Sequence, residues 1–402
     1  MLIPNRRAAR RSAVARGVGA DVTRTVAAED SASIRRVVRN PAANVSSLES
    51  AALIIGAAFF VIGGLIGLFA FWGQSLPIAG RGSLGAFAGV GGAIAAFLAF
   101  VLGRYLADRT PNPALRREIG QGLSVPGARL HWFDIVALAI AHGVIALLGW
   151  LAISTVLELS FRDAVVFPLP AAALGGVALA LTAYVSFLSA ARMTPMLLSL
   201  VLAVFLVVGA FASMLSASDP HWWEENLSAL GMTDDVSAKA FNLTLIIAGA
   251  IVTIVARYAT ATLPASTPPD RRGRDLVRLG LILIGIFLAC VGIFPVDEFF
   301  AIHNTVATGM AVCFAVIVIG LPRFIRTVPR VFVVLGYVYV AVIVVVAVFF
   351  ATGYYNLTAV ELVAGCLIFS WIIVFLRTAG ASGDQDADAG ALAEPAVVPS
   401  AG

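Results

Sequence analysis

Long apolar runs separated by short polar connections divide most of this chain. Ten runs reach the length needed to cross about 30 Å of hydrocarbon as a helix, which takes about 20 residues. They cover residues 52–73, 84–103, 133–156, 165–190, 195–216, 241–260, 277–294, 299–321, 331–351 and 359–377. The runs are continuous, whereas the strands of a membrane barrel alternate between apolar and polar residues. The pattern predicts an all-α polytopic integral membrane helix bundle of about ten transmembrane helices.

Composition agrees with this prediction and excludes a soluble globule. The chain is 60% hydrophobic and only 12% charged, whereas about a quarter of the residues in soluble domains are charged. We therefore expect membrane lipids as partners. The net charge of +4 comes from arginines spread over many connections, so no nucleic-acid partner is predicted. Cys290, Cys313 and Cys366 all fall within apolar runs, which indicates neither a disulfide framework nor a zinc site.

Basic residues are concentrated on alternate connections. Of the 27 Lys and Arg residues, only Arg81, Arg162 and Lys239 fall on the other set of connections. Cytoplasmic loops retain arginine, whereas translocated loops carry little of it. The chain is therefore predicted to lie in a plasma (inner) membrane with both termini in the cytoplasm. The excess of Arg, Ala, Gly and Val over Lys indicates a bacterial source.

Composition also predicts four segments along the chain. They are a disordered Arg-rich cytoplasmic tail (1–50), a two-helix membrane extension (51–130), an eight-helix membrane domain (131–378) and a disordered acidic cytoplasmic tail (379–402). In the extension, four-residue glycine spacings place two glycines on one helix face, as in Gly63 with Gly67 and Gly85 with Gly89. These spacings favour close helix packing within the protein. A homo-oligomer through the glycine-rich helices is the alternative.

Polar residues gather on two connections predicted to lie outside the cell, 216–242 and 291–304. Each leaves an apolar run through a proline, presents carboxylates near a histidine, and enters the next run close to an asparagine. A buried imidazole needs a hydrogen-bonding partner, and Asn242 is the candidate partner for His303. The predicted ligand-binding residues are His221, Glu224, Glu225, Asn242, Asp297, Glu298, His303 and Asn304.

The first of these connections also predicts a short amphipathic helix. Asp219 is a suitable cap, Pro220 suits the first helical position, and Gly231 would end the helix. Such a helix would lie on the membrane surface with its tryptophans at the level of the headgroups. It would serve as an interfacial anchor or, alternatively, as one wall of an outward-facing pocket.

Two further ionisable residues lie within apolar runs. His142 is far from either end of its run, and we expect a neutral, hydrogen-bonded imidazole there, with a proton-relay role as the alternative. Glu361 follows Thr358 at the spacing of a capping box, which predicts that it closes the start of the last helix.

Three motifs resemble a known family. DPHWWEENLSALG, SAKAFNLTLIIAG and GIFPVDEFFAIHNTVATG are similar to segments of the bacterial domain of unknown function 998 family, over roughly residues 130 to 380. The resemblance implies a membrane architecture and marks Ser228, Leu230, Gly231, Phe241, Asn242, Gly292, Phe294, Pro295 and His303. This chain carries Asp297 and Glu298 where the family usually has one carboxylate, and it adds Asn304.

The sequence names no reaction, since it carries neither a Gly-x-Ser-x-Gly elbow nor a Walker loop. It favours a noncatalytic lipid- or envelope-associated protein that binds a headgroup or small polar ligand from the outer leaflet, without a cofactor or metal. One alternative is a metal-dependent membrane hydrolase acting on lipid, in which His221, His303 and a carboxylate would converge on zinc. The other is a small-molecule transporter with a central cavity that reaches His142.

Overall fold

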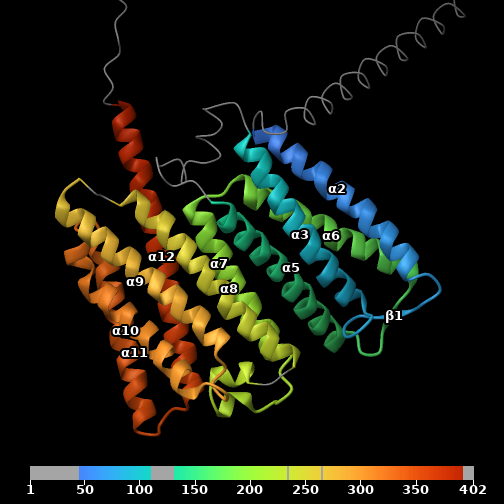
Figure 1. Ribbon diagram of the computed structural model, residues 1–402. Coiled ribbons are helices and arrows are strands. Elements are labelled where there is room, and N and C mark those ends of the chain that lie inside the picture. Colours follow the sequence, from blue (N-terminus) through green and yellow to red (C-terminus); the bar gives the residue numbers. More distant parts are fainter. Residues whose placement is uncertain (1–44, 110–130, 233–234, 264–265, 393–402) are drawn as a thin grey trace, which may run out of the picture.

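The computed structural model describes residues 45–109, 131–232, 235–263 and 266–392 (Figure 1). Most of the expected basic tail, the connection 110–130 and the end of the acidic tail lie outside these residues. In the described part, ten helices are long and apolar enough to cross a membrane. This confirms the predicted all-α polytopic bundle, and the protein is a multi-pass membrane protein.

The membrane helices are α2 (Val45–Ala70), α3 (Leu84–Asp108), α5 (Trp132–Ser160), α6 (Pro168–Ala191), α7 (Pro195–Leu215), α8 (Val236–Ala259), α9 (Pro268–Ile293), α10 (Phe300–Phe324), α11 (Arg330–Ala351) and α12 (Leu357–Leu392). The connections contain the short 3₁₀ helices η1 (Trp222–Glu224), η2 (Leu227–Gly231) and η3 (Thr260–Thr262). They also contain two short strands, β1 (Leu76–Pro77) and β2 (Val165–Val166), which pair antiparallel.

Capping residues explain why two helices begin well before their apolar runs. The Asp235 carboxylate accepts a hydrogen bond from the Ala238 N–H at 2.8 Å, so α8 begins at Val236. Thr267 and Asp270 form a capping box around the start of α9. Hydropathy therefore located the part of each helix that lies in the membrane, whereas capping side chains fix where the helix starts.

The helices pack in two groups, and an even number of spans brings both ends of the described chain to the same side (Figure 1). One group contains α2, α3, α5 and α6, and the other contains α7 to α12. Helix α5 joins the groups by packing against α7 and α8, where Leu138, Leu202 and Ile251 are fully buried. We call the side where α2 begins and α12 finishes the arginine end. The opposite side, which carries β1, β2, η1 and η2, is the loop end.

The glycine-rich faces of α2 and α3 pack against α6 and α5. A Cβ on Gly85 would lie 2.2 Å from the Ser154 side chain of α5, and one on Gly63 would lie 2.7 Å from Leu179 of α6. Only a residue without a side chain permits the approach at Gly85, whereas a side chain at position 63 would require Leu179 to move. The predicted packing within the protein is confirmed, and a homo-oligomer through these helices stays a prediction.

Helix α12 differs from its expected length. It continues to Leu392, whereas the sequence predicted a disordered tail from residue 379. The segment 379–392 contains five alanines, the strongest helix formers, but also three glycines, which are weak ones. It extends a helix that is already nucleated, so the cost of starting a helix does not arise again.

The predicted single amphipathic helix between Asp219 and Gly231 is wrong. Two 3₁₀ turns, η1 and η2, replace it, and Asn226 between them is fully extended with φ −160° and ψ 163°. The Asp219 carboxylate does organise the first turn, since it accepts a hydrogen bond from the His221 N–H at 2.8 Å. Several backbone groups of this connection bond to side chains at the starts of α8 and α12, so they do not continue one helix.

Candidate functional site

His303 lies buried in the first turn of α10 at the loop end, with both ring nitrogens engaged. Its Nδ1 is 2.7 Å from the carbonyl oxygen of Phe294, at the end of α9. Because a carbonyl can only accept a hydrogen bond, Nδ1 carries the proton in the neutral ring. Nε2 is then the acceptor for the Ser228 hydroxyl of η2, at 3.0 Å. This chain of hydrogen bonds ties the connection before α8 to the connection before α10.

Helix α12 holds the same connection from a second side. The Glu361 carboxylate accepts a hydrogen bond from the backbone N–H of Leu227 at 2.6 Å. The Asn356 side-chain amide donates to the carbonyl of Trp223 at 2.8 Å, while its oxygen accepts from the Ala359 N–H and caps α12. The predicted capping box of Glu361 is therefore wrong: Asn356 caps the helix, and Glu361 is directed to the neighbouring loop.

Asn242 fixes the end of the same connection rather than pairing with His303. Its amide donates to the carbonyl of Gly231 at 3.0 Å, so the predicted Asn242–His303 partnership is wrong. A Cβ on Gly231 would lie 2.4 Å from the Asn242 side-chain oxygen, and one on Gly292 would lie 2.6 Å from the Asn242 carbonyl. At Gly292 the backbone of α8 approaches α9 too closely for a side chain, and at Gly231 the Asn242 side chain occupies the space that a Cβ would need.

The six other predicted site residues are exposed on the two connections. His221, Glu224 and Glu225 lie in or beside η1, and Asp297, Glu298 and Asn304 lie before or in the first turns of α10. The two sets come from connections that meet at the Ser228–His303 hydrogen bond. The structure thus separates the eight predicted residues into two that hold the fold of the loop end and six that face away from the packed interior.

The ligands required for a zinc hydrolase do not converge in the part of the chain that the structure describes. Within it, no three His, Cys, Asp or Glu side chains are grouped so that they could hold a metal ion. His221 is exposed and lies 3.9 Å from Asp219, and both nitrogens of His303 are already hydrogen-bonded.

His142 is a packed core residue rather than the wall of a transport cavity. Its Nδ1 is 2.8 Å from the Leu138 carbonyl, its Nε2 is 2.8 Å from the Ser189 hydroxyl, and its ring lies against Phe100 with centroids 4.5 Å apart. Both nitrogens are satisfied, as expected for a neutral buried imidazole.

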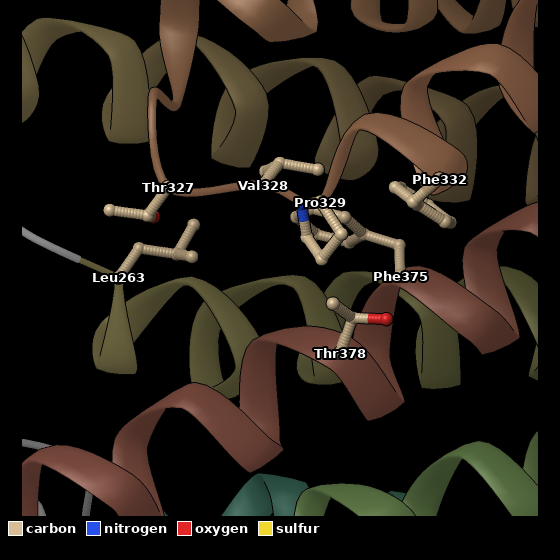
Figure 2. Close-up of a pocket in the computed structure, with 7 residues that line it drawn as sticks. All are labelled: Leu263, Thr327, Val328, Pro329, Phe332, Phe375 and Thr378. Atoms are coloured by element: carbon tan, nitrogen blue, oxygen red, sulfur yellow. The ribbon is translucent and has the colours of Figure 1, made fainter.

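Figure 2 shows a pocket near the arginine end, between the connection that follows α10 and the middle of α12. Its volume of about 10 Å³ is about what one water needs. It is lined by Leu263, Thr327, Val328, Pro329, Phe332, Phe375 and Thr378. The lining is mostly apolar, so this pocket offers few groups that could hold a polar substrate.

Residues 200–378 match the family model described as protein of unknown function DUF998. We call the matched residues 200–378 the DUF998 region. No curated protein and no solved structure matches the chain. The match begins inside α7 and ends in α12, so the DUF998 region coincides with the six-helix group, whereas the sequence resemblance had suggested a region starting near residue 130. Ser228, Asn242, His303 and Glu361 all lie within it.

A second polar cluster was not predicted from the sequence. Its Asp134 lies before the DUF998 match, whereas Tyr258 and Arg257 lie within it. Asp134 of α5 is fully buried, and its Oδ2 accepts hydrogen bonds from the Tyr258 hydroxyl at 2.8 Å and from Arg257 at 3.2 Å. The same oxygen accepts the backbone N–H of His131 at 2.9 Å and so caps α5. The available signal was the capping-box spacing of Asp134, three residues after His131, which hydropathy does not reveal. The cluster links the two helix groups.

Proposed function

We propose that the DUF998 region binds the headgroup of a membrane lipid, or a similar small polar ligand, at its loop end and catalyses no reaction. The observation that carries this proposal is the Ser228–His303 hydrogen bond, which joins two connections that carry exposed carboxylates. Hydrogen bonds from Asn242, Asn356 and Glu361 hold the longer connection in place. A surface fixed in this way loses little conformational freedom when a ligand binds.

Charge favours a cationic group on the ligand. The exposed residues of the two connections include the carboxylates of Glu224, Glu225, Asp297 and Glu298. Trp223, which is half exposed, suits the headgroup level of a bilayer. An amine-bearing headgroup such as that of phosphatidylethanolamine would meet the carboxylates with its ammonium group while its acyl chains remain in the bilayer.

The proposal includes an orientation. Arginine is concentrated at the arginine end, and we infer that this end faces the cytoplasm of a bacterial plasma membrane with both termini. The loop end then faces outward, and the ligand comes from the outer leaflet.

The test measures which lipids stay with the purified full-length protein. Native mass spectrometry would compare the wild type with a variant in which Glu224→Gln, Glu225→Gln, Asp297→Asn and Glu298→Gln are combined. We expect the wild type to retain phosphatidylethanolamine in a stoichiometric amount, and the variant to lose most of it, because neutral amides attract an ammonium group far less than carboxylates do.

A matched control uses carboxylates at the same end of the molecule but in the other helix group. Glu158→Gln combined with Asp163→Asn changes exposed side chains near β2 and should leave phosphatidylethanolamine retention unchanged. Equal retention by the wild type and the four-site variant would refute the proposal. Equal losses in the variant and the control would also refute it, because they would indicate a diffuse effect of surface charge.

A further inference from the structure

Three guanidinium groups come together at the arginine end, where α8 finishes beside α9. Arg257 lies in the last turn of α8, and Arg274 and Arg278 lie one turn apart on one face of α9. The Arg278 Nε donates to the Thr260 hydroxyl at 2.8 Å, and Thr260 follows Arg257 by three residues. Arg257 and Arg274 are close enough to Arg278 to repel it electrostatically, and Asp275 is close enough to attract it. We call these three residues the arginine cluster.

The carboxylates nearby do not balance the cluster. Arg257 pairs with Asp134 at 3.2 Å, and Arg274 pairs with Asp275 at 3.1 Å. Within the described residues, Arg278 forms no ion pair, and its one hydrogen bond goes to an uncharged hydroxyl. Three positive charges therefore face two negative ones, and one unit of positive charge is left without a partner.

Burial makes this imbalance costly. The Arg257 and Arg274 side chains are only 31% and 23% exposed, and Thr260, which holds Arg278, is fully buried. Like charges that are partly removed from water repel one another more strongly than in bulk solvent, unless an anion joins them. Because Arg278 bonds to Thr260 through Nε, its two terminal nitrogens can donate to such an anion.

The surroundings suit a lipid rather than a soluble anion. Leu279, which follows Arg278 on α9, is about half exposed on the outside of the bundle. On α5, the ring of Phe133 lies 5.4 Å from the Arg257 guanidinium, and the neighbouring Trp132 is 77% exposed. Aromatic and apolar side chains beside basic ones are typical of the bilayer interface, where an acyl chain can lie against the protein below a bound phosphate.

We propose that the arginine cluster binds the phosphodiester of an anionic phospholipid, such as phosphatidylglycerol, from the leaflet at the arginine end. One phosphodiester carries one negative charge, which matches the single unbalanced positive charge. Arg278 is the central ligand because the carboxylate near it, Asp275, pairs with Arg274 instead, while Arg257 and Arg274 flank the phosphate. This lipid site is separate from the proposed headgroup site, which lies at the loop end of the bundle.

The first experiment needs no substitution. The full-length protein is equilibrated with phosphatidylglycerol or phosphatidylcholine of identical acyl chains, and bound lipid is counted by native mass spectrometry. We expect one tightly held phosphatidylglycerol per protein and about tenfold weaker retention of phosphatidylcholine. Phosphatidylcholine has the same phosphodiester, but its trimethylammonium group is repelled by the three guanidinium groups. Equal retention of the two lipids overturns the proposal.

Variants then locate the site. Arg278→Gln should weaken phosphatidylglycerol retention about tenfold, and Arg278→Lys, which keeps the charge but not the planar donors, should weaken it less. The matched control is Arg326→Gln, an exposed arginine at the same end, which should retain lipid as the wild type does. If Arg278→Gln and Arg326→Gln weaken retention equally, the attraction is diffuse and the cluster is not a site.

Two further readouts distinguish the lipid site from a soluble-phosphate site and from the loop end. Glycerol 3-phosphate at millimolar concentration should not displace the lipid, because it lacks acyl chains; displacement would assign the cluster to a soluble phosphate and overturn the lipid proposal. Phosphatidylethanolamine retention, which tests the loop end, should be unchanged in Arg278→Gln. If Arg278→Gln loses both lipids while its size-exclusion profile matches that of the wild type, the two sites are not separate.

Discussion

The hydrogen bond between Ser228 and His303 provides the sharpest test of how the loop end is built. Ser228→Ala removes one hydroxyl that donates to Nε2 at 3.0 Å. A typical intramolecular hydrogen bond contributes about 1 kcal/mol net, and those between membrane helices average about 0.6 kcal/mol. We therefore expect Ser228→Ala to lower the free energy of unfolding by about 1 kcal/mol.

His303→Ala should cost more, because it removes more than this one bond. It also leaves the Phe294 carbonyl without its 2.7 Å partner and empties the volume of a side chain that is only 4% exposed. An unsatisfied buried group costs about 1–3 kcal/mol, and an unfilled cavity adds to that. The expected loss is about 2–4 kcal/mol in total.

A double-mutant cycle isolates the bond from these other losses. Unfolding of the single and double variants in mixed detergent, followed by tryptophan fluorescence, should give a coupling energy of about 0.6–1.5 kcal/mol for Ser228 with His303. The control cycle pairs Asn242→Ala with His303→Ala, since Asn242 bonds to Gly231 instead. Its coupling should be less than half as large. If the Ser228–His303 cycle gives no coupling, or if the two cycles give equal values, the assignment of partners is incorrect.

Two other predictions concern orientation and packing. In a cysteine-free background, a membrane-impermeant maleimide added to intact cells should label Glu224→Cys but not Arg272→Cys; the reverse pattern would invert the proposed orientation. Gly273→Ala should destabilise the protein by about 1–3 kcal/mol or more, since its Cβ would lie 1.8 Å from the Phe324 carbonyl oxygen. Gly365→Ala in α12 meets no atom within 4 Å, and thermal unfolding should show it to be neutral or slightly stabilising; equal losses in both variants would contradict the packing of α9 on α10.

Part of the loop end was predictable from local sequence. His303 was expected near the start of a span with buried ring nitrogens that need partners, and it is found there. Its partner was not predictable, because Ser228 is 75 residues away and no period in the sequence links the two. Glu361 shows the same limit: its spacing from Thr358 fits a capping box, but the carboxylate bonds to Leu227, 134 residues away.

The sequence by itself determined the number of spans, the all-α class and the alternation of basic connections. Hydropathy and charge are summed within each segment, so a segment carries this information before it packs against anything. Tertiary structure alone decided which helices form the two groups, which side chains satisfy the buried polar atoms, and that Arg257, Arg274 and Arg278 converge. Those outcomes depend on which helix faces meet in the bundle. Many apolar faces have similar hydropathy, so shape complementarity and hydrogen bonding between helices decide which of them pack together.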